Sequence, residues 1–168
     1  MNILELFAPI RVFVFDVDGV LTNGQLLLTP DNQMLRSMNI KDGYAMELAI
    51  KKGYKIWTIS GSKSEPAKAR FNRLGITNAY DGVTNKKAFL QELAAKENVS
   101  YAHILYMGDD IPDYAAMQIC GLPTCPNDAV AEITQVAKYI SPFKGGAGCV
   151  RDVIEKVLKL NGDWELPT

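Results

Sequence analysis

Short, mostly apolar runs that alternate with amphipathic segments constrain the fold of this 168-residue chain more than any other feature. The longest of these runs are Val12–Phe15, Tyr54–Ile59 and Ile104–Met107. Strands that alternate with helical segments are typical of β–α–β units, in which neighbouring strands are parallel. The pattern therefore predicts an α/β fold built on a doubly wound parallel sheet.

The remaining elements follow from capping residues and from helical spacing of apolar side chains. Two further short strands are expected at Asn78–Tyr80 and Leu122–Cys125. Helices are expected over residues 43–52, from a Ser64 cap to Leu74, from an Asn85 cap, over 111–120, from an Asn127 cap, and over 147–160. No repeat or linker interrupts this order, so residues 1–168 are interpreted as a single domain.

One segment, about residues 24–38, breaks the alternation and predicts a β-hairpin flap. Leu26–Leu28 and Met34–Met38 would be its strands, and Thr29–Asn32 has the residue types of a turn. A hairpin is not stable alone. We expect it to pack on another subunit or over the site, and the alternative is that it folds back on its own domain.

Bulk composition excludes several classes of protein. The chain is 48% apolar and 22% charged with a net charge of −1, which gives no signature for binding nucleic acid or an anionic membrane. Three cysteines, no basic leader and no long apolar run favour a cytoplasmic protein. A single histidine, His103, argues against a zinc site or a histidine-based triad.

Two carboxylates, Asp16 and Asp18, directly follow the first apolar run. Extended backbone would direct both to the same side, where their repulsion requires a cation or a shared proton. Mg²⁺ prefers such oxygen ligands, and an aspartate can act as a nucleophile in phosphoryl transfer. Paired acids also occur in ordinary solvated turns, so this pair alone does not decide the function.

Three more polar clusters lie at or near strand ends or helix starts. Ser60-Gly61-Ser62 could bind phosphate with a hydroxyl and backbone amides, or could be an ordinary loop. Lys86, at a helix start, opposes the helix dipole unless it neutralises a bound anion, although such lysines are usually just solvated. In Gly108–Asp113, Asp110 and Asp113 could cap a helix while Asp109 reaches a metal.

The order of these clusters resembles the haloacid dehalogenase superfamily of phosphatases over nearly the whole chain. The DVDGVLT and GDDIPD segments carry the resemblance. It implies that Asp16 is the nucleophile, Asp18 the general acid and base, and Ser60 and Lys86 the groups that hold the phosphoryl group. It also implies Mg²⁺ bound by the Asp16 carboxylate, the Asp18 backbone carbonyl and Asp109.

Within the superfamily the chain resembles the small branch without a separate cap domain, typified by 3-deoxy-D-manno-octulosonate 8-phosphate phosphatases. The hairpin leading into MNIKDGYAM, LGITNAYDGVTNK and KGGAGCVRDV carry this likeness. It implies a tetramer in which hairpins and C-terminal regions complete neighbouring sites, with Gly145–Gly148 as a mobile closing segment. Arg70 would meet the carboxylate of the sugar acid, or be a surface residue. The branch often has arginine where Ser62 stands here.

The expected activity is thus a phosphoric monoester hydrolase that releases phosphate from this eight-carbon sugar acid. A nine-carbon sugar-acid 9-phosphate is the alternative substrate, because loops and neighbouring subunits decide specificity. Two non-enzymatic alternatives remain at this stage. One is a receiver-type switch that keeps its phosphoaspartate, although Lys86 precedes the GDD cluster here, unlike in receivers. The other is a silent member that only binds a sugar acid.

Overall fold

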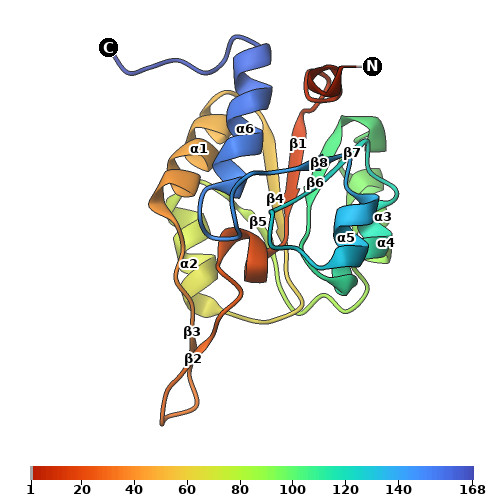
Figure 1. Cartoon of the computed structure of the whole chain (residues 1–168). Helices are drawn as coiled ribbons and strands as arrows, with labels where there is room; N and C mark the ends of the chain where they lie inside the picture. Colours follow the sequence, from red (N-terminus) through yellow and green to blue (C-terminus); the bar gives the residue numbers. More distant parts are fainter. Residues whose placement is uncertain (1) are drawn as a thin grey trace.

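The apolar runs form the middle of one six-stranded sheet in the computed structural model, which describes residues 2–168 (Figure 1). The strand order is β5-β4-β1-β6-β7-β8, and every neighbouring pair is parallel. The strands are β1 (Val12–Phe15), β4 (Lys55–Ile59), β5 (Asn78–Tyr80), β6 (Ile104–Met107), β7 (Leu122–Cys125) and β8 (Tyr139–Ile140). The predicted doubly wound parallel sheet is confirmed.

Side chains of the central strand alternate between two separate cores. Phe13 and Phe15 of β1 are fully buried in the core on one face, while Val12 and Val14 lie in the core on the other. This period of two is what a strand covered on both faces requires. The central strand is therefore held on both sides, which gives the residue that follows it, Asp16, a fixed position.

Helices cover both faces of the sheet (Figure 1). The face that contains Phe13 carries α1 (Ile40–Lys51), α2 (Glu65–Arg73) and α6 (Cys149–Leu160). The opposite face carries α3 (Lys86–Lys96), α4 (Tyr114–Met117) and α5 (Ala131–Val136). None of the helices in the described part of the chain is both long and apolar enough to span a membrane.

Several element boundaries differ from the prediction. Helix α1 begins three residues early because Asn39 Oδ1 accepts hydrogen bonds from the backbone of Lys41 and Asp42. Asn127 was wrongly predicted to cap a helix: its side chain donates to Pro142 O at 2.6 Å, and α5 starts only at Ala131. The helix predicted over 111–120 is a 3₁₀ turn followed by the short α4.

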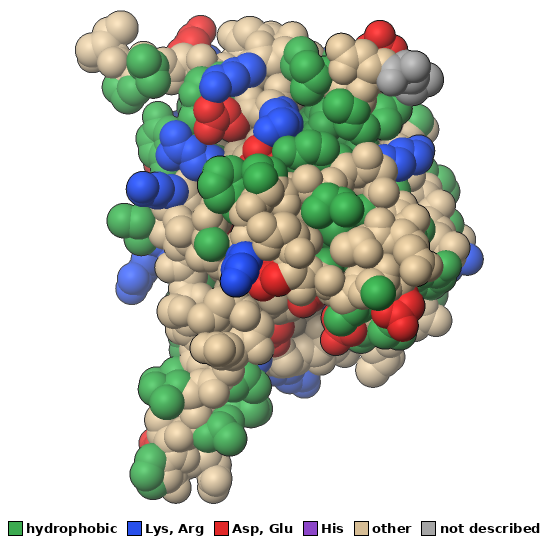
Figure 2. Space-filling model, viewed as in Figure 1, with side chains coloured by type: hydrophobic (Ala, Val, Ile, Leu, Met, Phe, Trp, Pro, Cys, Tyr) green, Lys and Arg blue, Asp and Glu red, His purple; other side chains and the backbone are tan. Residues whose placement is uncertain are grey.

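The predicted hairpin is present and projects from the carboxyl edge of the sheet (Figure 1). Its strands β2 (Leu27–Leu28) and β3 (Met34–Leu35) are antiparallel, and Asn32 has a φ of 63° in the turn. Figure 2 shows hydrophobic side chains gathered on this projection; Leu27 and Leu28 are 67% and 70% exposed. The chain termini lie at the opposite end of the molecule (Figure 1).

Candidate active site

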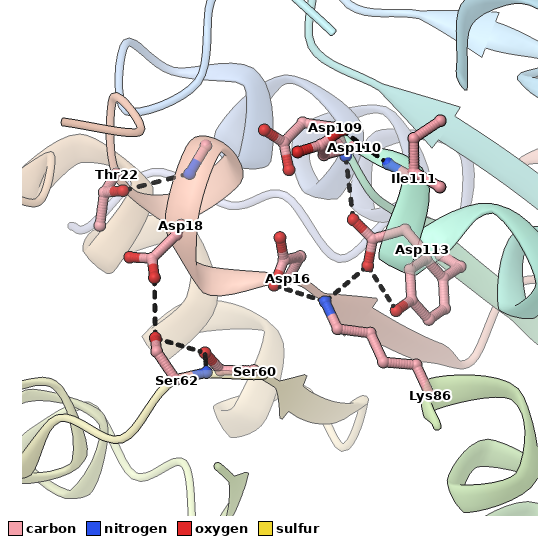
Figure 3. Close-up of polar contacts among 12 residues, drawn as sticks. Asp16, Asp18, Thr22, Ser60, Ser62, Lys86, Asp109, Asp110, Ile111 and Asp113 are labelled. Carbon is pink, nitrogen blue, oxygen red and sulfur yellow. Dashed lines mark hydrogen bonds and ion pairs between the residues drawn. The ribbon is translucent and has the colours of Figure 1, made fainter. Parts of the chain in front are cut away.

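The carboxyl ends of three neighbouring strands bring the predicted polar clusters together. Asp16 follows β1, Ser60 follows β4 and Asp109 lies two residues beyond β6, with β1 between the other two strands. Ligands of doubly wound sheets bind at this edge, where the strand order reverses. Figure 3 shows these residues grouped around Asp16.

Asp16 is buried and paired with a buried lysine. Its side chain is 9% exposed, and its Oδ1 accepts a hydrogen bond from Lys86 Nζ at 2.8 Å. Lys86 occupies the first turn of α3, whose N-terminus is capped by Asn85 as predicted. Burial lowers the pKa of Lys86, but the negative charges of Asp16 and Asp113 raise it by more. The net pKa is above the ordinary lysine value, so the ammonium stays charged.

Asp113 organises the lysine and the loop, which differs from its predicted role as a helix cap. Its Oδ1 accepts from Lys86 Nζ at 2.7 Å and from the Tyr106 hydroxyl at 2.9 Å, and its Oδ2 accepts from the backbone of Asp109 at 3.2 Å (Figure 3). Asp113 makes no capping hydrogen bond to α4. Asp110 does cap its turn, because its Oδ1 accepts from Ile111 N at 2.8 Å.

Three carboxylates are arranged so that they could hold a metal ion. Asp16, Asp109 and Asp113 each offer an oxygen, and these oxygens lie within 4.8 Å of one another. Burial, then the charge of Asp113, raises the pKa of Asp16 to about 6. Burial, then the charge of Asp16, raises the pKa of Asp109 to about 8. A hard divalent cation would offset this repulsion.

Asp109 is the carboxylate with the clearest free capacity for a ligand. Its Oδ1 is buried without a hydrogen-bond partner among residues 2–168, although buried polar atoms are normally satisfied. Asp113 already accepts from three donors. The donor set thus fits a cation held mainly between Asp16 and Asp109.

Glycines allow the loops around Asp109 to approach one another closely. Gly19 has a φ of +91°, and a Cβ there would lie 1.8 Å from Asp109 Oδ2. On its other side, a Cβ on Gly145 would lie 1.9 Å from Gly19 O, and Gly146 N donates to Val20 O at 2.9 Å. Residues 145–146 therefore pack against the loop after β1. That Gly145–Gly148 form a mobile closing segment, as the resemblance implies, stays a prediction.

A Gly19→Ala substitution should remove most activity, because the methyl group would displace the Asp109 carboxylate and the backbone conformation disfavours alanine. We expect kcat/KM to fall by roughly 100-fold or more, since sub-ångström placement of ligands matters at such sites. The measurement is steady-state phosphate release, with Gly162→Ala as the control. Gly162 also has a positive φ, but open space surrounds it. Equal losses of kcat/KM in both variants would mean that backbone strain alone explains the result, and that displacement of the Asp109 carboxylate does not.

Asp18 points away from Asp16 and toward a residue that the sequence did not suggest. Arg36, directly after β3, donates from Nε to Asp18 Oδ1 at 2.6 Å and from Nη2 to Asp18 Oδ2 at 3.2 Å. Ser62 Oγ donates to the same Oδ2 at 2.8 Å. Burial raises the pKa of Asp18, but the hydrogen bonds from Arg36 and Ser62 lower it more, so the net shift is downward.

The other predicted site residues lie in two places. Ser60 is buried at the end of β4, with its Oγ 3.2 Å from Ser62 Oγ. Gly61 follows, and a Cβ added there would make only an ordinary contact, 3.7 Å from Val83 O. Arg70 is not part of this cluster. It lines a neighbouring cavity together with Arg36, and its guanidinium packs against Gly43 of α1.

Comparison with known proteins agrees with this arrangement. A family model described as haloacid dehalogenase-like hydrolase matches residues 71–153. The 3-deoxy-D-manno-octulosonate 8-phosphate phosphatase KdsC of Escherichia coli (strain K12) is 32% identical over 153 residues, which cover 91% of this chain and 81% of the relative. The chain belongs to the haloacid dehalogenase-like hydrolases. This hydrolase is a phosphoric monoester hydrolase, related over most of its length to those phosphatases.

Solved structures similar to this hydrolase support the same family. The phosphatase of that name from Yersinia pestis superposes with a TM-score of 0.93 at 30% identity, covering 96% of this chain and 87% of the other. That from Moraxella catarrhalis, solved with a magnesium ion, a phosphate ion and a KDO molecule, gives 0.91 at 29% identity, covering 95% and 91%. Membership of a hydrolase family favours an enzyme over a phosphoaspartate switch.

Proposed function

We propose that this hydrolase releases phosphate from 3-deoxy-D-manno-octulosonate 8-phosphate through a phosphorylated Asp16. The observation that carries the proposal is a buried carboxylate at the end of β1, in contact with a buried lysine and beside a second, unsatisfied carboxylate. Relatives that share about a third of their residues with this chain have this activity in their names. The whole chain, residues 1–168, would act as one catalytic domain without a separate cap.

We propose Mg²⁺ as the cofactor, held by the carboxylates of Asp16 and Asp109 and by the backbone carbonyl of Asp18. The unpartnered Asp109 Oδ1 and the raised pKa values of Asp16 and Asp109 support a cation there. When bound, the ion supplies positive charge that lets an anionic nucleophile approach an anionic phosphate. The magnesium in the Moraxella structure is consistent with this choice.

In the first step the Asp16 carboxylate attacks phosphorus and the bond from phosphorus to the sugar oxygen breaks. Asp18, whose pKa is lowered here by Arg36 and Ser62, must take up a proton in the substrate complex, and it donates that proton to the leaving sugar oxygen. The Lys86 ammonium neutralises charge on the phosphoryl oxygens, and the Ser60 hydroxyl and the Gly61 amide donate hydrogen bonds to them. Asp113 keeps Lys86 in place through its 2.7 Å contact.

In the second step water attacks the aspartyl phosphate while Asp18, now a carboxylate, accepts a proton from it. The bond between phosphorus and the Asp16 oxygen breaks, which releases inorganic phosphate and regenerates Asp16. The position of Asp18 in the loop directly after the nucleophile, two residues beyond Asp16, supports this role. The Asp18 side chain accepts a hydrogen bond from Ser62 and lies on the side of the site nearest the hairpin.

We also propose that the active form is a cytoplasmic homotetramer. The exposed apolar hairpin supports burial against other subunits, since a two-stranded ribbon is unstable alone. The residues after α6 lie at the end of the molecule opposite the site, and we propose that they contribute to the site of a neighbouring subunit (Figure 1). Three buried free cysteines fit a reducing compartment.

The test is phosphate release with Mg²⁺ from a panel: the eight-carbon sugar-acid 8-phosphate, nine-carbon sugar-acid 9-phosphates, glucose 6-phosphate and p-nitrophenyl phosphate. We expect the highest kcat/KM for the eight-carbon ester, loss of activity in excess EDTA and recovery on adding Mg²⁺. Preference for a nine-carbon ester would change the substrate and keep the chemistry. Full activity in EDTA would exclude a metal-dependent reaction.

A further inference from the structure

The contact between Arg36 and Asp18 occupies the proposed acid and base. Both Asp18 oxygens accept hydrogen bonds from the guanidinium, through Nε and Nη2, and Oδ2 also accepts from Ser62. The Arg36 side chain is 5% exposed and that of Asp18 is 34% exposed, so the contact is covered on the arginine side and open to solvent on the carboxylate side. Both oxygens of the proposed acid and base are engaged by Arg36 and Ser62.

A cavity of about 290 Å³ lies on the other side of Arg36, between the hairpin and α2. Arg36 and Arg70 both line it, together with Ser64 and the apolar side chains of Met34, Leu35, Met38, Pro66 and Ala67. None of the lining residues is acidic, and Arg70 forms no ion pair within residues 2–168. Two guanidinium groups with only one carboxylate partner favour an anionic ligand in this cavity.

We propose that Arg36 is a latch that the substrate opens with its own carboxylate. A substrate carboxylate that enters the cavity takes Arg36 from Asp18, and Asp18 is then free to turn toward the ester oxygen. The proposal rests on the proposed function, since the substrate must carry both a phosphate ester and a carboxylate. It assigns to Arg36 both binding of the substrate acid and positioning of Asp18.

Partner exchange is favourable here because the two competing groups are chemically alike. A guanidinium edge matches one carboxylate at a time in two parallel hydrogen bonds, so binding of a second carboxylate displaces the first. The Ser62 hydroxyl donates to Asp18 Oδ2 and accepts from Arg36 Nη2 at 3.0 Å, so it can keep one of these partners when the other moves. A phosphate ester without a carboxylate leaves the latch closed, so the latch would discriminate against ordinary sugar phosphates.

The test compares Arg36→Gln and Arg36→Lys with the wild-type enzyme on two esters, the eight-carbon sugar-acid 8-phosphate and glucose 6-phosphate. For Arg36→Gln we expect kcat/KM on the sugar-acid ester to fall roughly 10- to 100-fold, mainly through KM, because a charged bidentate contact is lost. Its kcat/KM on glucose 6-phosphate should rise, because Asp18 is then free without a substrate carboxylate. Arg36→Lys keeps the positive charge but cannot form two parallel hydrogen bonds to a carboxylate. Its kcat/KM on the sugar-acid ester should therefore lie between those of the wild type and Arg36→Gln.

Arg73→Gln is the matched control, because Arg73 is an exposed arginine on α2. It should leave the ratio of the two kcat/KM values unchanged. Loss by the same factor on both esters in Arg36→Gln would overturn the latch and make Arg36 a support for Asp18 with any substrate. No change on either ester would overturn it as well.

A structural readout separates the latch from the proposed function. In a crystal structure with Mg²⁺ and the free eight-carbon sugar acid, we expect Arg36 on the ligand carboxylate and beyond hydrogen-bonding distance of Asp18. Arg36 still paired with Asp18 beside a bound sugar acid would refute the latch. If the wild-type enzyme does not hydrolyse the sugar-acid ester, the proposed substrate is wrong. The latch is then tested with another pair of esters, 6-phosphogluconate with a carboxylate and glucose 6-phosphate without one, by the ratio of their kcat/KM values.

Discussion

Asp16→Asn should abolish turnover while leaving the protein at least as stable as the wild type at neutral pH. The amide cannot attack phosphorus, and loss of a nucleophile lowers kcat by roughly 10⁴-fold or more. Burial raises the pKa of Asp16 from 3.8 to about 6, so the ionised carboxylate costs the metal-free folded state free energy above about pH 6. That cost fades as the pH falls, and it disappears below 3.8, where the carboxyl becomes protonated in both the folded and the unfolded state.

The measurement is phosphate release together with urea unfolding of the metal-free proteins at pH 7 and pH 3.5. Asp16→Asn should exceed the wild type in stability at pH 7, and the difference should vanish at pH 3.5. Asp163→Asn is the control, because this carboxylate pairs with Tyr54 away from the site. Wild-type activity in Asp16→Asn would exclude a covalent role for this residue, whatever its stability.

Lys86→Ala should damage both stability and catalysis. The lysine is the shared buried partner of Asp16 and Asp113, so its removal leaves two carboxylates without a counter-charge. Breaking a buried ion pair from one side costs about 3–5 kcal/mol. We also expect kcat/KM to fall roughly 10²- to 10³-fold, because the phosphoryl oxygens lose their cation. Because Mg²⁺ would supply positive charge in its place, the loss of stability should be smaller with Mg²⁺ than in EDTA.

Lys87→Ala provides a closely matched control, since it removes the same side chain one residue further along α3, where it is exposed. Its urea midpoint and kcat/KM should match the wild type. The two variants are compared by urea unfolding with Mg²⁺ and with EDTA, and by phosphate release. A stable Lys86→Ala protein with normal kcat/KM would exclude the ion-pair network as the core of the site.

The interior of the fold was predictable because its sequence signals are local. Val12–Phe15 and Ile104–Met107 were predicted with the observed boundaries, and Ser64 and Asn85 cap their helices as expected. The strand β8 was missed because two residues carry no periodicity. The Asn127 cap was wrong because a tertiary acceptor, Pro142 O, competes for its side chain.

The site was predictable where it depends on strand ends and not where it depends on loops. Parallel strands place Asp16, Ser60 and Asp109 at one edge whatever the loops do. The role of Asp113 as the partner of Lys86 depends on how a short turn folds back. The approach of Arg36 to Asp18 depends on the direction in which the hairpin leaves the sheet, and no local pattern encodes that direction.

The close contact of Gly19 with Asp109 on one side and with Gly145 on the other limits how this site can be transferred between proteins. Three segments far apart in sequence meet here: the Asp109 carboxylate lies against Gly19, and the backbone of residues 145–146 lies against the backbone of the loop after β1. Grafting the DVDG loop alone onto another parallel sheet would supply the carboxylates without the glycine layer that sets their spacing. Transfer of the site to another protein would therefore require all three segments together: the loop after β1, the loop that carries Asp109, and residues 145–146.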